Sequence, residues 1–160
     1  MESMKYCVRF LAVFIAAIIF SGCSAAQTAV EPPVISMTAA PQLQLKVVAS
    51  YPHDAAAFTE GLFFHGGNLY ESTGLKKHST LRKVDLQSGK VLLQHRLPDD
   101  VFGEGIALMD GKIVQLTWQK QRAYVYDAND FTVIGNLNYQ GEGWGLTTDG
   151  KSWISSNGSD

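Results

Sequence analysis

The sequence predicts an all-β protein that forms part of a β-propeller, because one segment recurs three times. Each copy has a glycine, an aliphatic residue, a short apolar strand, a tight turn and a second strand, and the copies start at Gly61, Gly105 and Gly145. These glycines lie 44 and then 40 residues apart. A four-stranded repeat of about this period, with no helical stretch inside it, is typical of propeller blades. A β-sandwich with chance similarity is the alternative.

The turns within the repeats support four strands per blade. The first hairpin of each repeat contains Gly66-Gly67, Asp110-Gly111 or Asp149-Gly150, which are strong signals for tight β-turns. The second halves also correspond, since Asp85 and Asp127 each begin a turn between two strand-like segments. We therefore expect two hairpins in each complete blade.

The repeats account for about two and a half blades. Blades are predicted over residues 58–97 and 102–137, with a third that starts near residue 142. The alternating segment Leu43–Ser50 predicts a further strand before them. Because propellers typically have 4 to 8 blades, we expect the chain to be a fragment or a truncated form of a longer protein.

The N-terminal part of the chain predicts export. Residues 1–23 combine a basic start, an apolar run over 10–20 and small residues before Cys23, which is the layout of a signal peptide. The run is shorter than the roughly 20 residues of a membrane span. Residues 20–23 resemble a bacterial lipobox, which predicts a lipid on Cys23 and a periplasmic or membrane-anchored lipoprotein. Ordinary secretion or an uncleaved anchor are the alternatives.

Composition limits the remaining possibilities. Residues 24–42 are rich in Ala, Thr and Pro and predict a flexible tether, which leaves 43–160 as the partial propeller domain. The only cysteines, Cys7 and Cys23, lie in the leader, so the domain has no disulfide and no cysteine nucleophile. With 13 basic and 15 acidic residues, the chain lacks the charge of a nucleic-acid binder.

The repeat also predicts a site at the mouth of the propeller. The loop that leads into the first strand of each blade opens near the axis, so the residues before each opening glycine converge there. An acid beside a large apolar ring can have its pKa raised toward neutrality. The predicted site consists of two acids and four aromatic side chains: Glu60, Glu104, Phe58, Phe102, Trp118 and Trp144.

Each of these residues has a simpler interpretation. An aromatic residue alone is consistent with core packing, and an acid at a strand end with capping of backbone donors. Two carboxylates with no His or Cys in matching register are a poor transition-metal site, and we expect no metal and no cofactor.

Five segments of the sequence resemble the plant and bacterial type of glutaminyl-peptide cyclotransferase, over about residues 45–160. They are 51–54 (YPHD), 57–62 (AFTEGL), 71–75 (ESTGL), 102–105 (FGEG) and 143–150 (GWGLTTDG). The resemblance implies a five-bladed propeller and a metal-independent aminoacyltransferase. Its substrate would be a peptide or protein with N-terminal Gln, which is converted to pyroglutamate with loss of ammonia.

The resemblance also implies roles for the predicted site residues. Glu104 matches the acid that moves the proton, and Glu60 matches a polar pocket position. The pocket aromatics of the family correspond to Phe58, Phe102, Trp118 and Trp144. Three further site residues of the family, an Asn, a Trp and a Lys from later blades, have no counterpart in the 160 residues.

We therefore expect a monomeric, lipid-anchored cyclotransferase. The competing hypotheses are an inactive truncated propeller that serves as a lipid-anchored binding module, and a lipid-anchored scaffold of the outer membrane.

Overall fold

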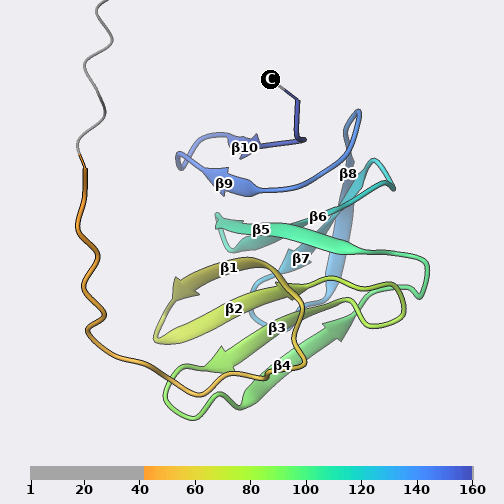
Figure 1. Cartoon of the computed structure of the whole chain (residues 1–160). Helices are drawn as coiled ribbons and strands as arrows, with labels where there is room; N and C mark the ends of the chain where they lie inside the picture. Colours follow the sequence, from red (N-terminus) through yellow and green to blue (C-terminus); the bar gives the residue numbers. More distant parts are fainter. Residues whose placement is uncertain (1–41, 160) are drawn as a thin grey trace, which may run out of the picture. The chain divides into compact units, whose positions relative to one another are not determined.

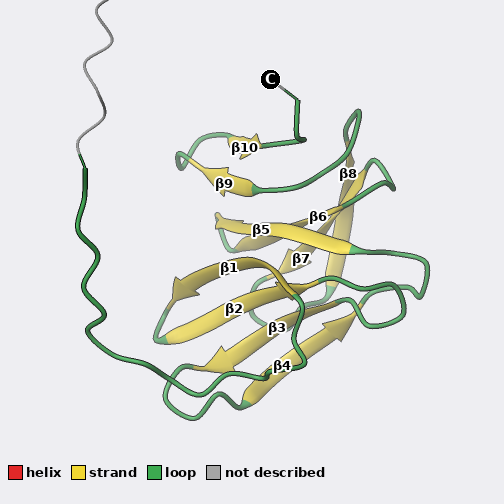
Figure 2. Ribbon diagram, in the orientation of Figure 1, coloured by secondary structure: helices red, strands yellow, loops and turns green. Residues whose placement is uncertain are grey.

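The computed structural model describes residues 42–159, and every regular element in this range is a β-strand (Figure 2). The predicted signal peptide with Cys23, and the tether up to residue 41, lie outside the described residues. No helix in the described range is long and apolar enough to cross a membrane.

The strands form three antiparallel sheets in which each strand pairs with the next along the chain (Figure 1). The first sheet contains β1 (Thr59–His65), β2 (Asn68–Thr73), β3 (Thr80–Asp85) and β4 (Val91–Arg96). The second contains β5 (Gly103–Met109), β6 (Lys112–Thr117), β7 (Arg122–Asp127) and β8 (Val133–Asn138). The third is the hairpin of β9 (Leu146–Thr148) and β10 (Trp153–Ser155). The all-β, four-stranded repeat is therefore confirmed.

The predicted hairpin turns form where the glycines allow them. The β1–β2 turn has positive φ at Gly66 and Gly67 (55° and 82°), and the β5–β6 turn has positive φ at Asp110 and Gly111 (50° and 69°). The two-residue turn whose twist matches that of a β-hairpin requires positive φ at both of its central residues. The dipeptides thus fix the register of the first two strands in each complete sheet.

The sheets pack face to face through two apolar clusters. The cluster between the first and second sheets contains Tyr70, Leu81, Leu97, Val101, Ile106, Ile113, Tyr124, Tyr126 and Phe131. The cluster between the second sheet and the β9–β10 hairpin is built on Val114, Leu116 and Ala123, with Leu146 and Trp153 packed against them. The second sheet is therefore covered on both faces, as expected of a blade inside a propeller.

A polar network crosses the first interface. Gln115, which is fully buried, donates from Nε2 to Ser72 Oγ at 2.7 Å, and the Tyr126 hydroxyl donates to Gln115 Oε1 at 2.9 Å. Since an unpaired buried amide would be costly, these bonds favour one alignment of the two sheets.

The strand predicted over Leu43–Ser50 is wrong. Residues 42–50 have no regular structure, and Val47 and Val48 are 82% and 89% exposed. β-Branched residues favour a strand only where they fit a pleated, half-buried surface, and no described strand pairs with this segment. The chain joins the first sheet at His53, whose Nε2 lies 2.9 Å from Glu71 Oε1.

Candidate active site

The first strands of the three sheets lie next to one another, with β5 between β1 and β9 (Figure 1). The backbones of these strands approach each other so closely that the positions that open the repeats must be glycine. A Cβ atom on Gly61 would lie 2.7 Å from the Ile106 nitrogen. One on Gly105 would lie 2.5 Å from the Leu146 nitrogen and closer still to the Trp144 carbonyl oxygen. Only glycine permits such contact between backbones.

Both acids of the repeat lie in β-bulges beside these glycines. Over residues 59–61, β1 uses one residue more than its partner β2, and Glu60 occupies this irregularity. Over residues 103–106, β5 likewise uses one more than β6, and Glu104 lies within it. A bulge redirects a side chain relative to the alternation of a regular strand. The repeat therefore redirects an acid at the same position in both sheets.

The structure brings all six predicted site residues around one cavity of about 430 Å³. Its lining consists of Phe58, Glu60, Phe102, Glu104, Trp118, Trp144 and Gly145. Phe58, Phe102 and Trp144 lie in the loops that lead into β1, β5 and β9. Glu60 and Glu104 lie at the starts of β1 and β5, and Trp118 directly follows β6. A cavity with aromatic walls and few polar groups is typical of a small-molecule or side-chain site.

Phe102 is the centre of the aromatic wall. Its ring lies edge-on to Phe58, with ring centroids 6.0 Å apart, and edge-on to Trp118, at 5.8 Å. Its carbonyl oxygen accepts a hydrogen bond from the Trp118 backbone nitrogen at 3.1 Å, and the Phe58 carbonyl accepts one from Gly74 at 2.8 Å. Backbone bonds at equivalent places in the two sheets thus hold the wall in position.

Glu104 has the electrostatics of a group that transfers protons. Its side chain is buried, with 9% exposure, and burial raises its pKa to about 7, with smaller contributions from the negative charges of Glu60 and Glu142. Burial also raises the pKa of Glu60. Within residues 42–159 no hydrogen bond reaches the Glu104 carboxyl group. Near neutral pH this group can therefore both accept and donate a proton.

Comparison with known proteins identifies the family of the chain. The sequence model of the glutamine cyclotransferase family matches residues 14–160. The chain belongs to the glutamine cyclotransferase family. The resemblance that the sequence motifs predicted is thereby confirmed.

Two relatives in this family are 39% and 34% identical to the chain over the aligned residues. Glutaminyl-peptide cyclotransferase of Arabidopsis thaliana is 39% identical over 117 residues, which cover 72% of this chain and 37% of the relative. The crystal structure of Myxococcus xanthus glutaminyl cyclase is 34% identical with a TM-score of 0.65, covering 71% of this chain and 47% of that one. The chain thus spans less than half the length of either relative.

A more distant structure supports the fold alone. The β-propeller domain of Cps50 (Swd1) from Myceliophteria thermophila is 11% identical with a TM-score of 0.52, covering 66% of this chain and 34% of that one. Together with the family match it confirms the propeller fold.

One residue beside the aromatic cavity was not predicted to have a role. Glu142 Oε2 accepts hydrogen bonds from Trp118 Nε1 at 2.7 Å and from Trp144 Nε1 at 3.0 Å, and Oε1 accepts one from Gln119 at 3.3 Å. These hydrogen bonds lower the pKa of Glu142, and the bond from Trp144 has the largest effect. The sequence places Glu142 beside Trp144, but nothing in the repeat pattern shows that it also reaches Trp118.

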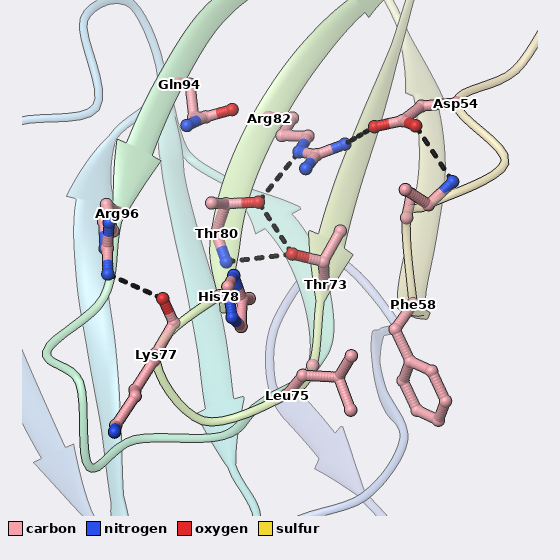
Figure 3. Close-up of a pocket in the computed structure, with 13 residues that line it drawn as sticks. Asp54, Phe58, Thr73, Leu75, Lys77, His78, Thr80, Arg82, Gln94 and Arg96 are labelled. Atoms are coloured by element: carbon pink, nitrogen blue, oxygen red, sulfur yellow. Dashed lines mark hydrogen bonds and ion pairs between the residues drawn. The ribbon is translucent and has the colours of Figure 1, made fainter.

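A second cavity, of about 460 Å³, shares Phe58 with the first (Figure 3). In it Arg82 donates to Asp54 Oδ2 and to Thr80 Oγ1, both at 2.9 Å, and the hydroxyl groups of Thr80 and Thr73 lie 2.7 Å apart. Asp54 belongs to the segment that leads to Phe58, so this network anchors the entry of the chain into the site.

The described residues contain no group of three or more His, Cys, Asp or Glu placed to hold a metal ion.

Proposed function

We propose that the complete protein is a glutaminyl-peptide cyclotransferase, an aminoacyltransferase that converts the N-terminal Gln of peptides or proteins to pyroglutamate and releases ammonia. Membership of the glutamine cyclotransferase family supports this proposal, as do the names of the Arabidopsis and Myxococcus relatives. The observation that carries it is the buried Glu104 carboxyl group, whose pKa is about 7, inside an aromatic cavity.

The proposed reaction is an intramolecular acyl transfer. The free α-amino nitrogen of the substrate attacks Cδ of the same Gln residue, and a new C–N bond forms. The bond from Cδ to the side-chain nitrogen then breaks, and ammonia leaves. Because both reacting groups belong to one residue, holding that residue in a folded conformation supplies much of the rate.

Glu104 is proposed to move the proton that this reaction requires. As a carboxylate it accepts the proton that the attacking amine loses, and as an acid it gives the proton to the departing nitrogen. A general acid–base residue of this kind contributes about 10²- to 10⁴-fold to the rate. A pKa near 7 suits both halves of the transfer, since both forms of the group are populated at neutral pH.

The other cavity residues are proposed to bind the substrate. The Gln side chain would be enclosed by the four aromatic residues of the cavity, Phe58, Phe102, Trp118 and Trp144. Their rings favour the neutral form of the substrate amine and limit the access of water. Glu60 is proposed as a polar binding residue. Its charge also raises the Glu104 pKa.

The test is ammonia release from a short peptide with N-terminal Gln. Wild-type protein should release one ammonia per peptide, and Glu104→Gln should lose the activity while keeping the fold. A peptide with an acetylated N-terminus is the control, because its nitrogen is no longer a nucleophile. Ammonia from the acetylated peptide would indicate a simple amidase, and binding of the free peptide without ammonia would favour a binding module.

We further propose that the protein is an exported monomer, with residues 1–23 as the signal peptide, Cys23 as the lipidated residue and 24–42 as the tether. The basic, apolar and small-residue order of this leader supports the proposal. Incorporation of labelled palmitate in a bacterial host, and its loss in Cys23→Ala, would test it.

A further inference from the structure

We propose that Glu142 is a positioning residue of the cavity, whose carboxylate holds the Trp118 and Trp144 indoles as the walls against which the substrate binds. This inference deepens the proposed function and rests on it. No sequence motif assigns Glu142 such a role, and its side chain does not line the cavity.

The two indoles come from different sheets and share one acceptor. Trp118 follows β6 of the second sheet, and Trp144 precedes β9 of the third. The Oε2 atom of Glu142 accepts from both indole nitrogens, at 2.7 Å and 3.0 Å. The loop that carries Glu142 is itself tied to the second sheet, because Gly143 donates its backbone N–H to the Trp118 carbonyl at 3.0 Å. One carboxylate oxygen therefore couples walls supplied by two blades.

Packing within residues 42–159 leaves both indoles partly uncovered. Trp118 is 36% exposed and Trp144 is 47% exposed, so each has solvent on part of its ring. An exposed side chain loses conformational entropy when it is confined to one rotamer. Hydrogen bonds to an ionised acceptor are about twice as strong as neutral ones, and here two of them act on one atom. They restrain the two side chains beyond what burial within the described residues does.

The bonds also explain why an acid occupies this position. Each indole is a donor only, so the bridging atom must be an acceptor, and a carboxylate is an acceptor at both oxygens. Its second oxygen accepts from Gln119 Nε2 at 3.3 Å, so both carboxylate oxygens serve as acceptors. A Gln side chain at position 142 would keep one oxygen that can accept from both indoles, whereas Ala would have no acceptor at all.

Steady-state kinetics on a Gln-initiated peptide test the role in binding. Glu142→Ala should raise KM about tenfold, as expected for loss of charge-assisted hydrogen bonds, while kcat falls less than about threefold because the proton-transfer group remains. Glu142→Gln should return KM to within about threefold of wild type. Asp130→Ala, in the β7–β8 turn, is the control for loss of a carboxylate. An unchanged KM in Glu142→Ala, or equal KM values for the Ala and Gln variants, would overturn the proposal.

The indole N–H signals in a nitrogen–proton correlation spectrum provide a test that does not need activity. The chain has three tryptophans, and Trp→Phe variants assign the signals of Trp118 and Trp144. Glu142→Ala should shift both signals upfield and speed their solvent exchange, while the signal of Trp153 stays in place. Two unmoved signals would refute the bridge. A wild-type protein that releases no ammonia would refute the proposed function, and the spectrum would still decide whether Glu142 holds the indoles.

Discussion

Replacing Glu104 with Gln should have opposite effects on activity and on stability. The amide has nearly the shape of the carboxyl group, but it is neutral and cannot exchange a proton at neutral pH. Ammonia release should therefore fall by about 10²- to 10⁴-fold, the usual contribution of a general acid–base residue. The free energy of unfolding should increase at alkaline pH, because the folded protein no longer has to hold an ionised carboxylate in an apolar cavity.

The size and pH range of the stability effect follow from the pKa. Folding raises the Glu104 pKa from 4.5 to about 7. Between these values the folded state holds more protons than the unfolded state, so stability falls as pH rises through this range and is lowest above 7. At 1.36 kcal/mol per pKa unit the whole shift corresponds to about 3 kcal/mol. Because the cavity opens to solvent, which screens the charge, we expect about 1–2 kcal/mol.

Urea unfolding at pH 5 and pH 8.5 measures this difference. Glu104→Gln should gain about 1–2 kcal/mol more over wild type at pH 8.5 than at pH 5. The control is Asp130→Asn, because hydrogen bonds from Thr132 hold the Asp130 pKa below its ordinary value of 3.8, so its effect is the same at both pH values. An equal gain at both pH values for Glu104→Gln would refute the raised pKa. Retained ammonia release would refute the catalytic role.

Three further changes test the site and the packing around it. Glu60→Gln removes a charge that raises the Glu104 pKa, so the rising limb of kcat/KM against pH should move to lower pH, and an unmoved limb would exclude the coupling. Gly105→Ala should lower the free energy of unfolding by about 1–3 kcal/mol, because the added Cβ overpacks β5 against β9. The control is Gly135→Ala, whose new Cβ has no atom within 4 Å. In denaturant melts it should change the free energy of unfolding by less than about 0.5 kcal/mol. Tyr126→Phe removes a buried donor and should cost about 1–3 kcal/mol, and a neutral result in the same melts would show that the inter-sheet network does not contribute.

The sequence was sufficient to predict the hairpins and the place where the cavity forms. Dipeptides such as Gly66-Gly67 need positive φ values, which few residues adopt, so they determine turns locally. The period of the repeat then places Phe58 and Phe102 at equivalent positions, and equivalent positions in a propeller face the same axis. The convergence of the site residues that precede the three opening glycines is thus a consequence of the repeat, which is visible in a single sequence. Trp118 lies outside this pattern, because it follows β6.

Features that depend on the details of strand pairing or on contacts between blades were not predictable. The segment Leu43–Ser50 has the composition of a strand, but strand formation requires a partner, and composition does not show whether one is present. The bulges at Glu60 and Glu104 depend on pairing with β2 and β6. The role of Glu142 depends on a side chain 24 residues earlier in the chain, and no periodic signal connects the two.

The three equivalent loops also show how one backbone position can give acids of different function. Glu60 and Glu104 occupy matching bulges, but only Glu104 has two further negative charges acting on it, from Glu60 and Glu142. In the third repeat Trp144 takes the position of the acid, and the acid lies two residues earlier, where hydrogen bonds from the indoles lower its pKa. Glu142 is thereby kept ionised, and its fixed charge helps to keep Glu104 partly protonated at neutral pH. Where environments separate the pKa values of neighbouring carboxyl groups, one group can hold charge while another moves protons. This separation is the reason that we propose Glu104, and not Glu142, for proton transfer.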